Sequence, residues 1–364
     1  MSRSLLLVLF LLPFVVFSQE KQASNFSVDA QYYYGTLLRH NKNIAHLVRQ
    51  HPVGLVLSFN KKTYGEQYWQ ESYNYPDWGI SFVYQDFRTE TLGQNFGLYG
   101  HYNFYFLNRH LLFRLGEGVG YNTNPFDIDT NFKNIAYGSK FLASTYLLFQ
   151  YEETLWDALD INLGISFVHH SNGSFKAPNS GTNVLGFNAG LKYHINQEQE
   201  IAYKQSSKKS KDFAEPIKLN LVFRSGVNEG DFFNLGQHPF YVFSAFVDKR
   251  LNYQSSIQLG VEYFISEFLQ REIEYVAASF PGRVDPDTDY KRAAFLLGHE
   301  FRIGKFAIPT QLGVYFYWPY EYESRVYSRV GAKYYFTDTI FGVATVKTHA
   351  ANAENIEFGI GLRI

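Results

Sequence analysis

The chain has 364 residues and a formal net charge of −1 at pH 7, and it contains 29 Tyr, 35 Phe and no Cys. The near-zero net charge gives no electrostatic reason to expect a nucleic-acid partner. The lack of Cys excludes a lipoprotein anchor, a disulfide framework and a thiolate metal site.

The first residues have the pattern of a secretory signal peptide. Arg3 supplies a positive charge, residues 5–17 form an apolar run, and Ser18 ends a segment that fits a signal-peptidase site. We therefore expect residues 1–18 to be the signal peptide and Gln19 to begin the mature chain. The apolar run is short for a membrane span, and no later stretch reaches the roughly 18 consecutive apolar residues that a transmembrane helix needs.

Segments that alternate apolar and polar side chains recur along the rest of the chain. The clearest are residues 78–85, 95–106, 217–224, 257–263, 295–302 and 356–364. A period of two residues predicts strands with two different faces. The polar face holds Lys, Arg, Glu, Asn and Gly, which suits a water-filled or charge-packed lumen. In an exported, aromatic-rich chain this pattern predicts an all-β fold, a transmembrane antiparallel β-barrel of the bacterial outer membrane. The alternative is a large soluble periplasmic β-protein.

The number and spacing of the candidate strands suggest a large barrel. We count about 16 strands, eight before residue 196 and eight after 215, with about 14 as the alternative because the number should be even. Long outer loops are expected near 39–51, 122–138, 171–183, 228–238 and 265–290. We expect a first half, 19–195, a polar linker or turn, 196–215, and C-terminal strands, 216–364, that complete one larger barrel.

A candidate site lies at the end of the strand expected to finish near residue 170. His169 and Ser171 share the apolar, lipid-facing side of this strand, and parity places Asn183 on the same side of the next strand. A polar cluster facing lipid is costly unless it has a use. An imidazole beside a hydroxyl is the minimal pair for an activated nucleophile. These residues therefore predict hydrolysis of an acyl ester of an outer-leaflet lipid.

The expected roles follow the logic of serine hydrolases. Ser171 would attack the ester carbonyl, His169 would take its proton, and a third group would orient the imidazole ring. The N–H groups of Asn172 and Gly173, or the Asn172 side-chain amide, would bind the oxyanion. Glu117 also lies on the apolar side of its strand, which indicates either a bulge, a slipped register or an acid that supports the site.

Residues 167–173 (FVHHSNG), followed by residues 178–181 (PNSG), resemble the lipid A 3-O-deacylase family of outer-membrane barrel esterases. The resemblance implies His169 and Ser171 as catalytic residues, Asn172 in the oxyanion hole, and lipid A or lipopolysaccharide as the substrate among the membrane lipids. From the residues themselves we expect no cofactor and no metal, because no segment has the pattern of a phosphate-binding loop or the spacing of a calcium loop. The family's third triad member, a Glu, falls on Asn183.

This departure leaves several interpretations open. Asn183 works as the orienting group, another acid substitutes for it, or activity is lost. In the last case the protein would be a porin-like or structural barrel with a vestigial site. The family's members are small eight-stranded barrels, so the resemblance accounts for nothing after residue 215.

Overall fold

The computed structural model describes residues 26–195, 202–205, 213–230, 232, 235–350 and 352–364. The expected signal peptide and its cleavage site lie outside the described residues. The strands in the first half are β1 (Phe26–Leu37), β2 (Val53–Lys61), β3 (Asp77–Asp86), β4 (Gln94–Phe106), β5 (Leu111–Asn122), β6 (Phe141–Trp156), β7 (Leu159–Ser171) and β8 (Thr182–Ile195). Those in the second half are β9 (Lys218–Glu229), β10 (Gln237–Arg250), β11 (Ser255–Ser266), β12 (Arg292–Ile303), β13 (Phe306–Tyr317), β14 (Val326–Tyr335), β15 (Ile340–His349) and β16 (Asn352–Arg363).

In the described part of the chain, four short helices lie between these strands. They are η1 (Asn43–Leu47), α1 (Tyr68–Ser72), η2 (Leu107–Arg109) and α2 (Glu267–Ser279). The described helices are too short and too polar to span a lipid bilayer.

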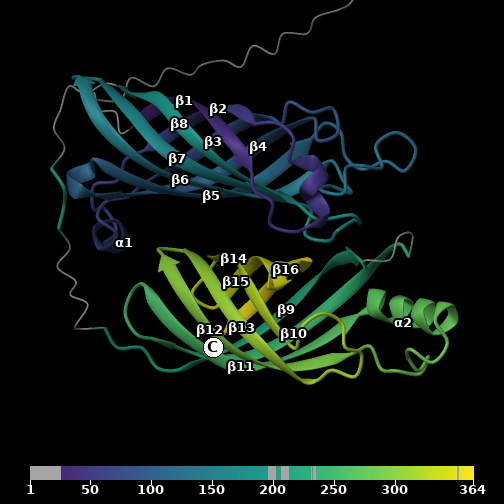
Figure 1. The fold of residues 1–364 in the computed structure, drawn as a ribbon. Coiled ribbons are helices and arrows are strands. Elements are labelled where there is room, and N and C mark those ends of the chain that lie inside the picture. Colours follow the sequence, from purple (N-terminus) through teal and green to yellow (C-terminus); the bar gives the residue numbers. More distant parts are fainter. Residues whose placement is uncertain (1–25, 196–201, 206–212, 231, 233–234, 351) are drawn as a thin grey trace, which may run out of the picture.

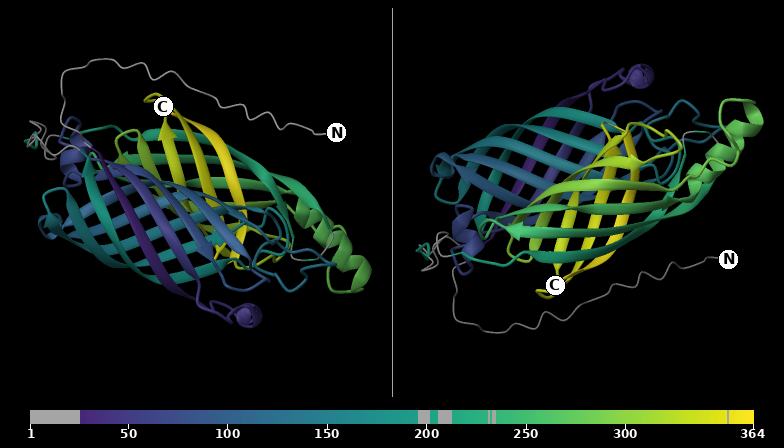
Figure 2. Two further views of the ribbon diagram at one scale, coloured as in Figure 1. Left: turned by 90° about the horizontal axis from the view of Figure 1, so that it is seen from above. Right: turned by 90° about the horizontal axis from the view of Figure 1, so that it is seen from below.

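The strands form two closed antiparallel barrels of eight strands each, which lie side by side (Figures 1 and 2). The all-β barrel prediction and the strand count are confirmed, but the expected single larger barrel is not what forms. β8 pairs with β1 along the whole of β1, and β16 pairs with β9. Both edges of every strand are therefore used within one half of the chain, which leaves β8 no free edge to pair with β9.

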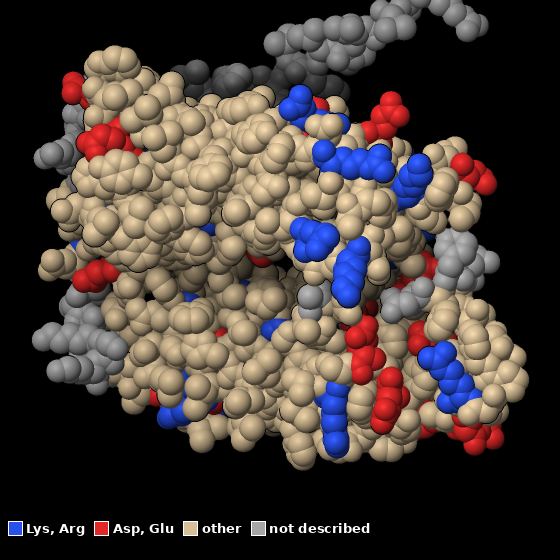
Figure 3. All heavy atoms as spheres, viewed as in Figure 1, with Lys and Arg blue, Asp and Glu red and all other residues tan. Residues whose placement is uncertain are grey.

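Alternation along the strands separates a lipid-facing wall from a packed lumen. On β7, Leu163 and Ile165 are about half exposed, whereas Asn162, Ser166 and His170 are buried. The visible wall between the two ends of the barrels is formed mostly by uncharged side chains (Figure 3). This distribution is the one that a lipid-facing barrel needs.

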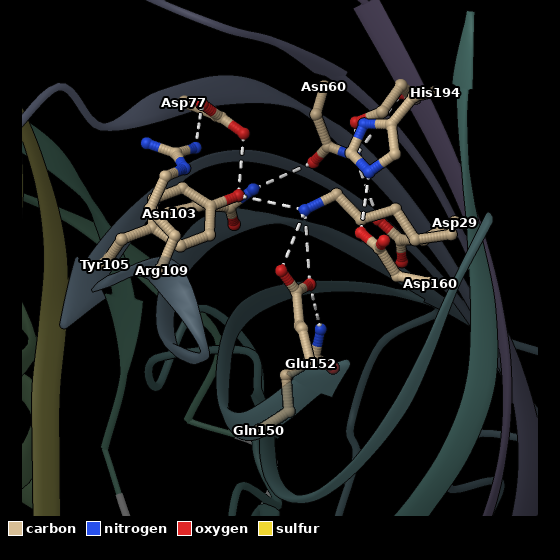
Figure 4. A network of polar contacts seen from close by, with 12 residues as sticks. Asp29, Asn60, Asp77, Asn103, Tyr105, Arg109, Gln150, Glu152, Asp160 and His194 are labelled. Atoms are coloured by element: carbon tan, nitrogen blue, oxygen red, sulfur yellow. Dashed lines mark hydrogen bonds and ion pairs between the residues drawn. The ribbon is translucent and has the colours of Figure 1, made fainter. Parts of the chain in front are cut away.

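Ion pairs and hydrogen bonds cross the lumen of the first barrel. The Arg114 guanidinium bonds Asp29 at 2.9 Å and Asn103 at 2.7 Å, although Asp29 lies on β1 and Arg114 on β5. Towards the end with the short turns, the Lys192 ammonium bonds Glu152 at 3.0 Å (Figure 4). The lumen is therefore charge-packed, one of the two states expected from the sequence.

The second barrel has its own buried network. Arg329, which has no exposed surface on its side chain, bonds Glu262 at 2.8 Å and Glu357 at 2.6 Å. Nearer the long loops, Arg292 bonds Glu354 at 2.5 Å. Burying charges in this way is tolerated because each has an opposite charge and hydrogen bonds at close range.

The two barrels contact each other at both ends. At the short-turn end, the Tyr73 hydroxyl beside α1 donates to the Arg302 carbonyl at 3.1 Å, and the Tyr68 and Tyr253 rings lie 4.4 Å apart. At the opposite end, the β7–β8 loop reaches the rim of the second barrel, where Ser174 Oγ donates to the Ala353 carbonyl at 2.5 Å. The long loops of both barrels gather at this second end (Figure 1).

Candidate functional site

Three polar side chains meet on the outward face of the first barrel at its long-loop end. His169 pairs directly with Asn183 across β7 and β8, and Ser171 follows two residues later on the same face. The strand alternation that makes Ile165 outward-facing therefore does the same for His169 and Ser171. The structure brings together the three residues that parity placed on one side.

A continuous chain of hydrogen bonds links these side chains. His169 Nδ1 lies 2.6 Å from Asn183 Oδ1, and His169 Nε2 lies 3.1 Å from Ser171 Oγ. Because an amide oxygen accepts only, Nδ1 carries the proton in this arrangement, and Nε2 accepts from the Ser171 hydroxyl. Ser171 is 9% exposed, and His169 and Asn183 are half-buried. The set has the connectivity of a nucleophile, a base and an orienting group.

The loop after Ser171 is organised by Asn172. The Asn172 N–H donates to Asn179 Oδ1 at 2.7 Å, and the Asn172 side-chain nitrogen donates to the Lys176 carbonyl at 2.6 Å. The Asn172 backbone N–H and one of the two hydrogens of its side-chain amide are thus engaged in this conformation, and no hydrogen bond of the described residues uses the second amide hydrogen. None of the hydrogen bonds of the described residues uses the Gly173 N–H either, which leaves it as an available backbone donor near Ser171.

Two glycines shape the backbone around Ser171. Gly173 has φ +58°, and Gly181 has φ +65°. These angles lie in the left-handed region that Gly adopts without strain. A Cβ on Gly181 would stand 3.2 Å from the Ser171 Cβ and 3.5 Å from the His169 Cε1. The return of the loop to β8 therefore packs directly against the Ser–His pair.

Loops from the rest of the first barrel contact the end of the β7–β8 loop beside the site. The N–H groups of Ser180 and Gly181 donate to the carbonyls of Ile135 and Ala136 at 3.1 and 3.0 Å. The His40 ring nitrogen Nε2 contacts the Ser180 carbonyl at 2.9 Å. Three segments far apart in the sequence, 38–52, 123–140 and 172–181, thus converge at the site.

Glu117 lies on the same outward face, on β5, two strands away from His169. Its pairing is regular on both sides, with Gly100 on β4 and with Thr145 on β6. A bulge or slipped register therefore does not explain its position. Thr145 Oγ1 donates to Glu117 Oε1 at 2.9 Å, and Thr145 pairs with His169. Within the described contacts Glu117 reaches Thr145 and not the imidazole.

Some site residues have little or no sequence signal. Asn179 accepts the hydrogen bond of the Asn172 N–H. It belongs to the Pro-Asn-Ser-Gly segment, but its position in that segment predicts no particular role. Glu229 contacts the loop from the second barrel, and nothing in the sequence connects it to Ser171. Among the described residues, no cluster of three or more His, Asp or Glu side chains is placed to hold a metal ion.

Comparison with protein families gives two matches. Residues 53–192 match the family described as Lipid A 3-O-deacylase (PagL), and residues 217–364 match the family described as Acyloxyacyl hydrolase, C-terminal domain. Together they cover most of the chain, with one match in each barrel. The second match supplies a counterpart for the part of the chain that the sequence resemblance left unexplained. No curated protein sequence matches the chain.

Solved structures of outer-membrane barrels also align with the chain. Neisserial surface protein A (NspA) is 11% identical, and the alignment covers 48% of this chain and all of NspA, with a TM-score of 0.33. A mutant porin from Rhodopseudomonas blastica is 9% identical, with coverage of 93% of this chain and 99% of the porin and a TM-score of 0.20. Omp33 from Acinetobacter baumannii is 8% identical, with coverage of 94% and 99% and a TM-score of 0.18. At these scores none of the three carries an argument about function.

Proposed function

Because this chain belongs to the lipid A 3-O-deacylase family of outer-membrane ester hydrolases, we propose that it removes a fatty acyl chain from lipid A by a Ser171–His169 mechanism. The observation that carries the proposal is the hydrogen-bonded series Ser171, His169 and Asn183 on the outward face of the barrel. A substrate held in the outer leaflet reaches such a face without leaving the membrane.

In the first half of the reaction, Ser171 Oγ attacks the ester carbonyl while its proton passes to His169 Nε2. The tetrahedral intermediate collapses to an acyl-enzyme as the bond to the sugar oxygen breaks, and the imidazolium gives its proton to that oxygen, which leaves as a hydroxyl. In the second half, water attacks the acyl-enzyme, with His169 again as the base. The products are a free fatty acid, the deacylated lipid and unchanged Ser171.

The developing oxyanion needs N–H donors next to Ser171. Gly173 supplies one, since its N–H makes no hydrogen bond with the described residues. Asn172 contributes by shaping the loop through Asn179 and Lys176. The Asn172 backbone N–H could donate to the oxyanion only after its bond to Asn179 opens, whereas the second hydrogen of the Asn172 side-chain amide is not engaged.

Asn183 holds the imidazole in the tautomer that leaves Nε2 free to accept the Ser171 proton. An amide carries no charge, so it stabilises the imidazolium less than a carboxylate does. The reaction is therefore expected to be slower than with an acid at this position. Glu117 does not replace Asn183 as the orienting group, because its carboxylate bonds Thr145 and not His169.

The surroundings of the site suit a lipid with an anionic head. Outward-facing apolar side chains flank it, with Phe141 and Phe187 each 74% exposed and Leu185 40% exposed. The loop at 38–52 carries Lys or Arg at three positions and no Asp or Glu. Figure 3 shows Lys and Arg side chains gathered at this end of the first barrel. Acyl chains would lie along the wall, with phosphates near the loops.

The alternative, a porin-like barrel with a vestigial site, receives no support from the lumens. Side chains such as Arg114 and Arg329 reach across them into ion pairs.

The test is mass spectrometry of lipid A from cells that express the wild-type chain or its Ser171→Ala variant at equal levels. We expect one acyl chain to be lost only with the intact Ser171, while both proteins show the same heat-modifiable migration of a folded barrel. Unchanged lipid A in both strains would remove the esterase assignment.

A further inference from the structure

The second barrel forms several hydrogen bonds with the loop that follows Ser171. The Glu229 N–H at the end of β9 donates to the Ser174 carbonyl at 2.9 Å, and the Glu229 carboxylate accepts from the Ala177 N–H at 2.9 Å. One residue of the second barrel therefore bonds the loop at two points. Gln237 on β10, the strand partner of Glu229, donates to the Phe175 carbonyl at 2.6 Å.

A third strand of the same barrel, β16, completes the contact. Ser174 Oγ donates to the Ala353 carbonyl at 2.5 Å, and Ile356 on β16 packs against Gly173 so closely that a Cβ there would stand 2.3 Å from its Cγ1. All these contacts fall on residues 173–177. The first barrel holds the other end of the loop, at Ser180 and Gly181.

We propose that the C-terminal barrel is a positioning element for catalysis, and that Glu229 acts by fixing the loop that presents the Gly173 N–H. The inference rests on the proposed function and gives a role to residues 217–364. Oxyanion donors work because they are already aimed before the reaction begins. Without the second barrel, residues 173–177 would be held only by the bonds of Asn172 within the loop and by those of Ser180 and Gly181, which would leave Gly173 more free to move.

The test compares Glu229→Ala with Glu229→Gln in the full-length protein, using a soluble ester and purified lipid A as substrates. Loss of the acceptor for the Ala177 N–H is expected to lower kcat about tenfold, because small misplacements of a reacting geometry are costly. KM should change far less. Gln keeps an oxygen acceptor, so Glu229→Gln should retain most of the wild-type kcat. The control is Glu274→Ala, which removes an exposed carboxylate of α2 whose ion pair is with Arg271.

Hydrogen exchange of the peptide containing residues 172–178 gives a readout independent of turnover. Glu229→Ala should speed its exchange, and Glu229→Gln and Glu274→Ala should not. Should Glu229→Ala fail to fold, Ser174→Ala removes the bond to Ala353 instead and should also lower kcat.

The outcomes separate the two proposals. A wild-type kcat with unchanged exchange in Glu229→Ala would overturn the positioning role while leaving the esterase intact. An equal fall in Glu274→Ala would overturn it too, because the loss would not be specific to the loop. An inactive wild-type protein would remove the esterase assignment, and the exchange measurement would still decide whether Glu229 orders the loop.

Discussion

His169 donates through Nδ1 to Oδ1 of Asn183, at 2.6 Å, from directly opposite positions on β7 and β8. The bond fixes the ring so that Nε2 points to Ser171 Oγ. A carboxylate at Asn183 would make the same bond and would also stabilise the imidazolium that forms in the proposed reaction.

We therefore predict that Asn183→Asp, which is nearly isosteric, raises kcat by at least about tenfold. Asn183→Ala should lower kcat, because the ring loses its orienting partner. Both are measured as initial rates of ester hydrolysis by the refolded protein. A wild-type rate in Asn183→Ala would contradict the orienting role, and a lower rate in Asn183→Asp than in the wild type would contradict stabilisation of the imidazolium by charge. Glu117→Gln should leave the rate within about threefold, since its bond ends at Thr145.

The strands and the site face could be predicted because both depend on a period of two residues. Each lipid-facing strand repeats the pattern, and the same parity places His169, Ser171 and Asn183 together. Whether the strands close into one barrel or two could not be predicted from this period of two residues. Alternation is identical for one barrel of sixteen strands and two of eight, and the pairing of Phe26 with Ile195 leaves no local signature.

The hydrogen bonds of the loop after Ser171 could not be predicted from the sequence for a related reason. The sequence predicts that Asn172 donates to the oxyanion, yet its backbone N–H bonds Asn179 and one hydrogen of its side-chain amide bonds Lys176. The contact from Glu229 depends on how two barrels pack against each other. Hydrogen bonds of this kind depend on tertiary placement, which spacing along the chain does not encode.

A second prediction concerns Gly181, whose φ of +65° and close approach to the Ser–His pair leave little room for a side chain. Gly181→Ala should reduce kcat by about 10–100-fold through displacement of the pair. Gly282→Ala is the matched control, since Gly282 has φ +82° but a Cβ there would meet no atom within 4 Å. Both variants carry left-handed strain, and only the first should lose activity. Equal losses would mean that strain alone, rather than contact with His169 and Ser171, is responsible.

The last prediction concerns the buried network of the second barrel. Arg329 has no exposed side-chain surface and bonds Glu262 and Glu357 together. Arg329→Ala leaves two buried carboxylates without this partner, so we expect the free energy of unfolding to fall by about 3–5 kcal/mol. Urea unfolding in detergent micelles, followed by gel migration, measures the change. Arg271→Ala is the control, because its ion pair with Glu274 is exposed and should contribute little. Equal stability of the two variants would mean that water enters the lumen and screens these charges, which would reopen the case for a conducting barrel.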